Sequence, residues 1–127
     1  MRWLTVTSSV VGALLWSAAV IAQPLTIDAL QGNWMMTAPS TDERALPRFT
    51  IDGQSIQGFD GCNEFSGRLD QPGSIGSTRR GCPGQTLRLP FDLSDPMPRL
   101  TSGKIEKGKL TLPADGPFPE TSFRKGS

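Results

Sequence analysis

Glycine and proline are so frequent in this chain that long helices have no room to form. The sequence of 127 residues contains 14 glycines and 11 prolines, and 24 of these 25 residues lie after position 22. Proline removes a backbone donor and glycine raises the entropic cost of ordering the chain, so both interrupt helices. The apolar residues are clustered between these interruptions, which is typical of short strands separated by turns. The chain is therefore expected to be mostly β.

The strand pattern is clearest in "RFTIDGQSIQGF", residues 48–59. Phe49 and Ile51 alternate with polar neighbours, and Ile56 leads a return strand toward Phe59. Asp52 and Gly53 between them predict a hairpin with a two-residue type I′ turn. Weaker patterns predict further strands at residues 34–37, 67–69 and 121–124, a pair of strands around Lys107-Gly108, and one helical turn near Ser94.

The N-terminus has the layout of a secretory signal. Arg2 precedes an uncharged stretch that runs to Ile21, and small residues at positions 20–22 suit cleavage between Ala22 and Gln23. A retained membrane anchor is the alternative, but the stretch is near the lower length limit for a bilayer span. Residues 1–22 are therefore predicted to be a signal peptide. Residues 23–127 would be a single periplasmic or secreted domain without stable membrane insertion.

Charge and histidine content narrow the possible functions. Removal of residues 1–22 would take away only Arg2, leaving 12 basic and 12 acidic residues, so no long-range attraction to nucleic acid is expected. The chain has no histidine, so the common Ser-His and Cys-His catalytic pairs and histidine metal sites are excluded. We expect no enzymatic activity, no catalytic residue, no metal and no cofactor.

A series of short motifs carries a family resemblance. In chain order they are Leu30-x-Gly-x-Trp34, Ile51-Asp-Gly53, Gly58-Phe-x-Gly-Cys-Asn63 followed by Phe65 and Gly67, Thr78-x-x-x-Cys82, and Leu110-x-Leu112. This order resembles the META domain family, to which the HslJ heat-shock protein belongs, over about residues 27–125. The resemblance implies a small β-rich α+β domain in which a curved antiparallel sheet, or partial barrel, carries a helix. It also implies an envelope or heat-shock stress role with no agreed enzymatic activity.

The chain departs from the family pattern after the second cysteine. Members of the family continue there into a helix with a glutamate. This sequence instead has prolines at positions 83, 90, 96 and 98 and no glutamate in that stretch. At most one short helix is therefore expected in residues 83–101.

Cys62 and Cys82 are the only cysteines. In an exported domain such a pair most often forms a disulfide, although a reactive thiol and a metal ligand are the alternatives. A reactive thiol needs a base or a cation, and only Arg79 and Arg80 lie nearby in sequence. We favour the disulfide.

The other motif residues have structural interpretations. Gly58, Gly61 and Gly67 suit positive φ angles or close backbone approach, and Asn63 suits a turn. The oxygen atoms of Asp60, Asn63 and Glu64 match no known calcium loop. The aromatic and aliphatic positions are predicted to form the core: Trp34, Phe49, Ile51, Phe59, Phe65 and Phe123.

Four basic residues near the C-terminus form a possible patch for an acidic partner: Arg99, Lys104, Lys107 and Lys109. A solvated sheet edge is the simpler interpretation of this cluster. Taken together, the sequence predicts a monomeric, non-enzymatic binding or interaction module of the cell envelope, whose partner is an unknown envelope protein or small ligand. The alternative is a periplasmic protease inhibitor of the small β-barrel type, because such inhibitors share a Gly-x-Trp opening and one disulfide.

Overall fold

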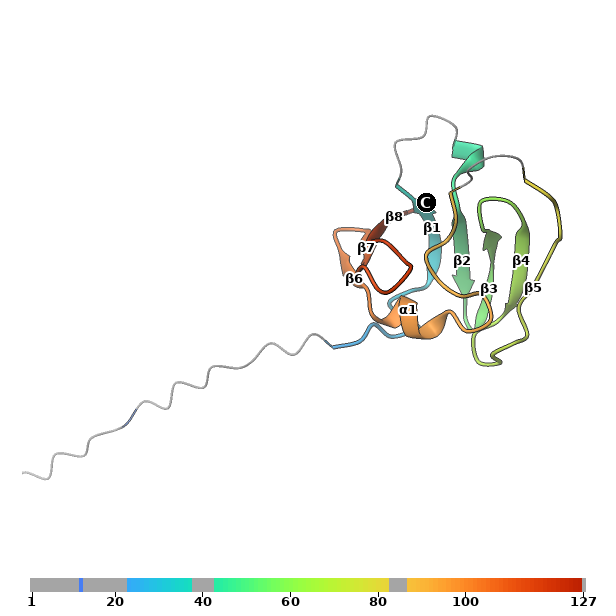
Figure 1. Cartoon of the computed structure of the whole chain (residues 1–127). Coiled ribbons are helices and arrows are strands. Elements are labelled where there is room, and N and C mark those ends of the chain that lie inside the picture. Colours follow the sequence, from blue (N-terminus) through green and yellow to red (C-terminus); the bar gives the residue numbers. More distant parts are fainter. Residues whose placement is uncertain (1–11, 13–22, 38–42, 83–86, 127) are drawn as a thin grey trace, which may run out of the picture.

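The chain folds into one curved antiparallel sheet of eight strands, which a computed structural model describes for residues 12, 23–37, 43–82 and 87–126 (Figure 1). The strands are β1 Gly32–Met36, β2 Arg48–Asp52, β3 Ser55–Phe59, β4 Glu64–Arg68, β5 Gly76–Ser77, β6 Lys104–Glu106, β7 Lys109–Leu112 and β8 Thr121–Lys125. Their order across the sheet is β5-β4-β3-β2-β1-β8-β7-β6. The sheet bends into a barrel that stays open between the edge strands β5 and β6. The expected β-rich partial barrel is confirmed.

The inner face of the sheet forms the hydrophobic core. In β1 and β2 every second residue is buried, as expected for strands with one face turned inward. Trp34 is 1% exposed, and its Nε1 donates a hydrogen bond to the carbonyl oxygen of Leu30 at 2.9 Å. The ring of Phe49 makes edge-to-face contacts with Phe91 and Phe123, with ring centroids 5.6 Å and 5.2 Å apart. The predicted core is confirmed except for Phe59, which is only half-buried.

The position of Phe59 follows from strand alternation. Ile56 is buried in β3, and residues three apart on a strand point to opposite faces. Phe59 therefore shares the outer face with Gln57, and the guanidinium of Arg48 lies 5.1 Å from the centre of its ring. Phe59 was expected in the core because it is aromatic, but the alternation of side chains along β3 places it on the outer face.

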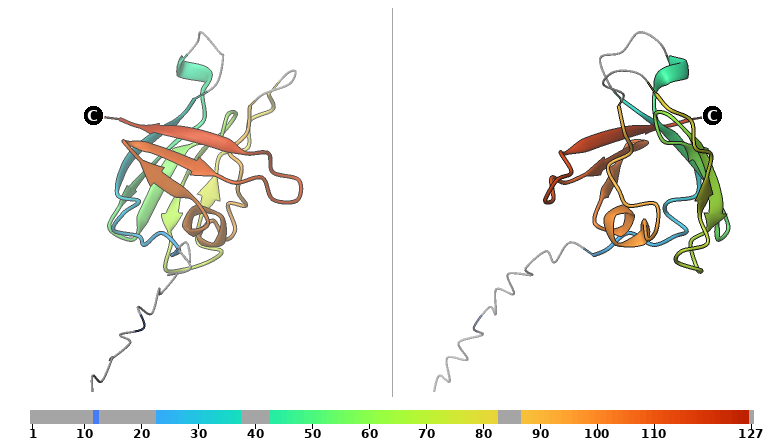
Figure 2. Two further views of the ribbon diagram at one scale, coloured as in Figure 1. Left: turned by 90° about the vertical axis from the view of Figure 1, so that its left-hand side faces the viewer. Right: turned by 45° about the vertical axis from the view of Figure 1, so that its right-hand side comes forward.

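The stretch that leads from residue 87 to the helix runs between the two halves of the barrel. In both views of Figure 2 it passes between the β6–β8 side and the β2–β5 side. Leu89 and Phe91 from this stretch are buried in the core. The helix α1, Met97–Thr101, lies across the end of the barrel that is lowest in Figure 1. Its residue Leu100 is buried in the core at this end.

Helix α1 is the one α-helix in the described residues, and it begins slightly later than the predicted helical turn near Ser94. A turn precedes it, in which the carboxylate of Asp92 accepts hydrogen bonds from the backbone N and the hydroxyl of Ser94. These bonds, the backbone one first, hold the pKa of Asp92 below its ordinary value. Pro96 is the N-cap and Pro98 lies in the first turn, where a missing N–H donor costs nothing. A short 3₁₀-helix, η1 Glu43–Ala45, precedes β2.

Two predicted turns are confirmed, one with a shifted register. Lys107 and Gly108 both have positive φ and join β6 to β7, as a type I′ turn requires. In the β2–β3 hairpin Asp52 pairs with Ser55, so the loop is Gly53-Gln54 and not Asp52-Gly53. Only Gly53 has a positive φ, +60°, which indicates a type II′ turn. The strand expected at residues 67–69 also differs, because Gly67 and Arg68 end β4 instead of starting a strand.

The turn geometry makes Gly53 important for folding. A Cβ at this position would meet no atom within 4 Å, so a substitution costs backbone strain alone. Gly53→Val is expected to destabilise the protein by roughly 1–3 kcal/mol, measured by chemical denaturation. Gln54→Val in the same exposed turn is the control and should change stability much less. Equal stabilities of both variants would contradict the type II′ assignment.

The described residues contain no helix that is both long enough and apolar enough to span a bilayer. The predicted signal peptide, residues 1–22, lies outside the described residues apart from Gly12.

Candidate functional site

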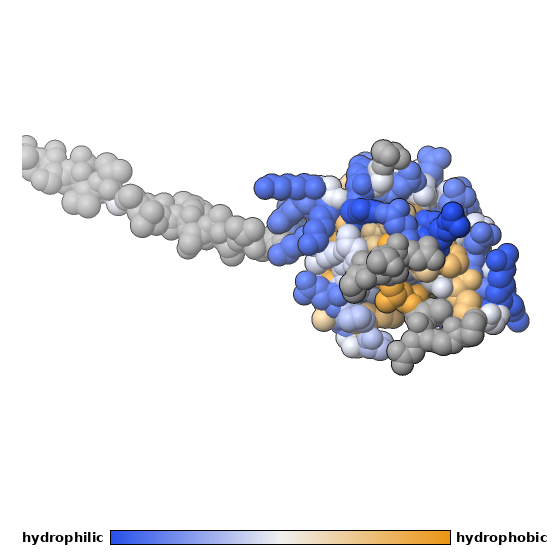
Figure 3. Space-filling model, turned by 90° about the horizontal axis from the view of Figure 1, so that it is seen from above, coloured by the Kyte–Doolittle hydropathy of each residue, from blue (hydrophilic) through white to orange (hydrophobic). Residues whose placement is uncertain are grey.

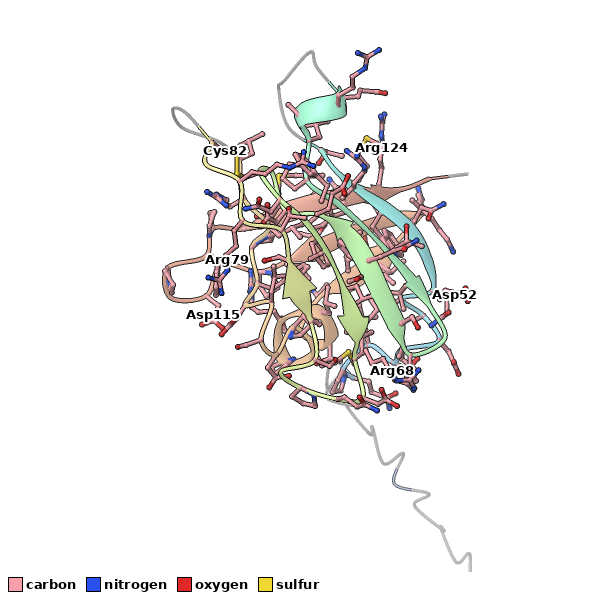
Figure 4. All side chains as sticks on the ribbon, turned by 90° about the vertical axis from the view of Figure 1, so that its right-hand side faces the viewer. Asp52, Arg68, Arg79, Cys82, Asp115 and Arg124 are labelled. Atoms are coloured by element: carbon pink, nitrogen blue, oxygen red, sulfur yellow. A yellow bond between two sulfur atoms is a disulfide. The ribbon has the colours of Figure 1, made fainter. Side chains whose placement is uncertain are left out.

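The motif around Cys62 forms the loop between β3 and β4. This loop is joined to the stretch that follows β5. Cys62 and Cys82 form a disulfide with Cα atoms 5.8 Å apart, which confirms the predicted pairing. The bond lies at the end of the barrel opposite α1, near the top in Figure 4. Seen from this end, apolar surface is surrounded by hydrophilic residues (Figure 3).

Two polar side chains hold the loop that carries Cys62. Oδ1 of Asp60 accepts hydrogen bonds from the backbone N atoms of Cys62 and Asn63, at 2.8 Å and 2.6 Å. Oδ1 of Asn63 accepts from the backbone N of Arg80 and from the hydroxyl of Thr78. Asn63 therefore fastens its loop to the segment beyond β5 instead of bonding its own backbone, and the motif Thr78 is its partner. The structural interpretation of Asn63 thus holds with a different partner, and Asp60 has a structural task that the sequence did not predict.

The motif glycines lie where the chain passes close to another segment. A Cβ on Gly58 would lie 2.8 Å from Cα of Phe49 and 2.9 Å from the ring of the motif residue Phe65. A Cβ on Gly61 would overlap the carbonyl oxygen of Leu87, and Gly61 also has a φ of +108°. A Cβ on Gly67 would lie 2.6 Å from Cα of Ile75. Real Cβ atoms do not approach so closely, so these glycines are needed for packing.

The predicted basic patch loses one member. Arg99 is only 7% exposed, and its guanidinium donates hydrogen bonds to the carbonyl oxygens of Pro90 and Pro113. It also lies 5.3 Å from the centre of the Phe118 ring. Arg99 thus fastens the stretch before α1 to the loop between β7 and β8 and offers no surface charge. Lys104, Lys107 and Lys109 are exposed on the β6–β7 hairpin.

The outward side chains of β1–β4 form two cross-strand rows, the first mixed in character and the second polar throughout. Strand register places Met35, Arg48, Phe59 and Glu64 side by side in the first row. The second row consists of Asn33, Thr50, Gln57 and Ser66. Cross-strand partners lie close enough to interact, and the hydroxyl of Thr50 donates to Oδ1 of Asn33 at 2.6 Å. The second row thus forms a continuous band of hydrogen-bonding groups, whereas Met35 and Phe59 alternate with the charged groups of the first row.

An open groove of about 740 Å³ lies over these rows on β2–β5. Its lining includes the outward side chains of Arg48, Gln57, Phe59, Glu64 and Thr78. Figure 4 looks onto this face and shows Arg79 beside β5, with Asp52 and Arg68 at the opposite end of the strands from Cys82. Ligand sites are concave and hold a few placed polar groups in a mostly apolar lining; this groove is concave but more polar, so a polar ligand fits it best.

The two ends of this face differ in charge. At the end near Asp52, both oxygens of Asp70 accept hydrogen bonds from Arg68, at 2.9 Å and 2.8 Å. The side-chain hydrogen bond from Arg68 is the main cause that lowers the pKa of Asp70. At the other end, none of the described carboxylates forms an ion pair with Arg48, Arg79 or Arg80. Among the described residues at the end of the groove near the disulfide, Arg48, Arg79 and Arg80 thus outnumber the single lining carboxylate, Glu64.

Sequence reasoning missed the outer face as a site. Its residues are single polar positions between core residues and form no linear motif: Asn33, Arg48, Thr50, Gln57, Glu64 and Ser66. The signal that predicts them is the alternation itself, since Phe49, Ile51, Ile56 and Phe65 point inward and their neighbours must point outward.

Comparison with known proteins agrees with the fold. The family described as META domain matches residues 23–119. No curated protein and no solved structure matches the chain.

Proposed function

This chain belongs to the META domain family, and from that premise we propose that it is a non-enzymatic, exported binding module of the cell envelope that contributes to stress tolerance. The outer face of β2–β5 is its binding surface in this proposal. The site chemistry fits binding better than catalysis, because the chain lacks histidine and the paired cysteines leave no free thiol in the described residues.

The groove over the two rows of outward side chains is the observation that carries this proposal. Side chains that point outward from a solvated sheet need no particular order for folding. Here they form a hollow with aligned amide, hydroxyl, carboxylate and guanidinium groups around one half-buried ring. The rigid strands below hold these groups in place, so little conformational entropy is lost when a ligand binds.

Site-specific crosslinking in the native envelope tests the binding surface. A photoreactive residue at Gln57, in the centre of the face, should give a discrete adduct. The same residue at Glu120, in the exposed loop between β7 and β8, is the matched control. Equal labelling at both positions, or none at Gln57, would overturn the proposal. Stoichiometric loss of an exported protease's activity on addition of the protein would show instead that it is an inhibitor.

Export predicts a defined N-terminus for the mature protein. Cleavage after Ala22 should give a chain that begins at Gln23, measured by N-terminal sequencing or intact mass of protein recovered from the envelope or the medium. The reason is the set of small residues before the cleavage point. Recovery of folded, membrane-held protein that retains Met1 would contradict export by a cleaved signal.

A further inference from the structure

We infer that the ligand of the outer-face groove is a saccharide chain that carries carboxylate or phosphate groups. This inference rests on the proposed binding function and adds the chemical class of the ligand. Three features lead to it: the hydrogen-bonding groups of the groove lining, the positive charge of Arg48 and the arginines near it, and the extended shape of the groove.

The lining matches a ligand rich in hydroxyl groups. Gln57 and Ser66 offer an amide and a hydroxyl that both donate and accept hydrogen bonds, and the hydroxyl of Thr50, which donates to Asn33, can still accept one. Glu64 adds a carboxylate that accepts from hydroxyl donors. The ring of Phe59 is the large apolar surface among the outward side chains, and such a ring can pack on the C–H face of a sugar. A peptide with apolar anchors would find no second apolar pocket among these side chains.

The arginine in the first row is oriented but forms no ion pair with a described carboxylate. The guanidinium of Arg48 stacks on Phe59, and its Nη1 lies 3.5 Å and 3.4 Å from the carbonyl oxygens of Arg44 and Leu46. These contacts limit its rotamers without supplying a negative charge. Arg68, at the far end of the face, is already engaged by Asp70. An anionic group is therefore attracted to the Arg48 end, where a bidentate bond to carboxylate or phosphate is possible.

Arg79 and Arg80 extend this positive end. They follow directly after Thr78, which lines the groove, and both are exposed. Figure 4 shows Arg79 beside the edge strand β5. Neither arginine lines the groove itself, so a ligand reaches them only by extending past β5, which favours a chain with more than one negative charge.

The shape of the groove favours an extended ligand over a compact one. It is open to solvent and crosses four strands, a distance of about 14 Å at the usual spacing between strands. Strand faces of other small β-barrels bind oligosaccharides in this manner. A short chain of linked sugar rings fits such a surface.

Titration of the oxidised domain, residues 23–127, with defined oligosaccharides tests the inference. Binding is followed by NMR shifts of backbone amides and by calorimetry. Oligogalacturonate and a phosphorylated mannan oligosaccharide are the probes for carboxylate and phosphate. The methyl ester of the first and the unphosphorylated form of the second are the uncharged controls. We expect shifts at Gln57, Ser66 and Thr78 with at least one charged probe, and about tenfold weaker binding of its uncharged form.

Single substitutions show which part of the protein surface contacts the saccharide. Arg48→Gln should weaken binding by about tenfold or more, whereas Lys104→Gln, which removes a positive charge on the opposite side of the barrel, should not. Ser66→Glu adds a negative charge to the second row without altering the arginine stack, so it should weaken binding even if Arg48→Gln folds poorly. Equal binding by all three variants would overturn the inference.

The outcomes separate the ligand class from the binding function. Binding of an oligoglutamate peptide at the same amides, as tightly as either charged sugar, would show that the groove takes acidic peptides. If no saccharide binds while crosslinking at Gln57 still gives an adduct, the ligand class is wrong and the binding function stands. If the groove amides do not respond to any probe and Gln57 gives no adduct, both are wrong.

Discussion

Replacing Gly61 with alanine is expected to lower the free energy of unfolding by about 3–5 kcal/mol, which combines backbone strain with overpacking. The φ of Gly61 is +108°, a region that L-residues rarely adopt. A Cβ there would also overlap the backbone carbonyl of Leu87, which cannot move away as a flexible side chain would. Leu89, two residues later, donates its backbone N–H to the carbonyl oxygen of Asp60, so the two segments are tied together. Chemical denaturation measures the loss.

Two other glycines separate the causes of this effect. Gly73 has a φ of +86°, but a Cβ there would meet nothing within 4 Å, so Gly73→Ala carries strain without overlap. Gly76 has neither a positive φ nor a close neighbour, so Gly76→Ala should be nearly neutral. We expect stability to fall in the order Gly76→Ala, Gly73→Ala, Gly61→Ala, with about 1 kcal/mol for Gly73→Ala. A loss at Gly61 no greater than that at Gly73 would contradict the close approach to Leu87.

The sequence predicted the structure best at positions where the conformational preference of one or two neighbouring residues decides it. Lys107-Gly108 forms the expected turn, because a two-residue hairpin demands positive φ and glycine supplies it. The β2–β3 hairpin was predicted with its loop one residue too early. Asp-Gly suits type I′, but the pairing of Asp52 with Ser55 places Gly53 first in a type II′ loop. The order of the motifs predicted the family, and the presence of two cysteines in a chain expected to be exported predicted the disulfide.

The features that the sequence could not predict depend on contacts between residues that are far apart in the chain. Leu89 and Phe91 lie in a proline-rich stretch with no periodicity, yet they enter the core because the open barrel leaves a space between its two halves. Arg99 looked like one of four exposed basic residues. Its burial follows from two carbonyl groups, those of Pro90 and Pro113, that only the folded chain brings together. Tertiary packing overrides local composition at both places.

The candidate site was missed for a related reason. Arg48, Phe59 and Glu64 come from three strands and lie next to one another only through the register of β2, β3 and β4. A linear motif search gives weight to the cysteine and the glycines, and the structure shows that these residues hold the loops and strands in place. The alternation of the strands predicts which residues face outward, but not that their outer face is hollow.

Removal of the disulfide is the second large effect that we expect. The variant with both Cys62→Ser and Cys82→Ser should lose roughly 2–4 kcal/mol, because the bond closes a loop with a sequence separation of 20 and so restricts the unfolded chain, and because it also ties the native loop after β3 to the stretch after β5. The hydrogen bonds of Asp60 and Asn63 also hold this loop in the folded state. They remain in the variant, so the fold should persist at reduced stability.

Thiol chemistry and a double-mutant cycle complete this test. The native protein, denatured without reductant, should show no free thiol, and the reduced parent should match the double-serine variant in stability. The disulfide and Gly61 both act on the junction between the loop after β3 and the stretch that starts at Leu87. Their substitutions should therefore be non-additive when combined, whereas Gly53→Val, at the opposite end of the β2–β3 hairpin, should add independently to the loss of the disulfide. Strict additivity with Gly61→Ala would mean that the disulfide acts on the unfolded chain alone and leaves the native junction unaffected.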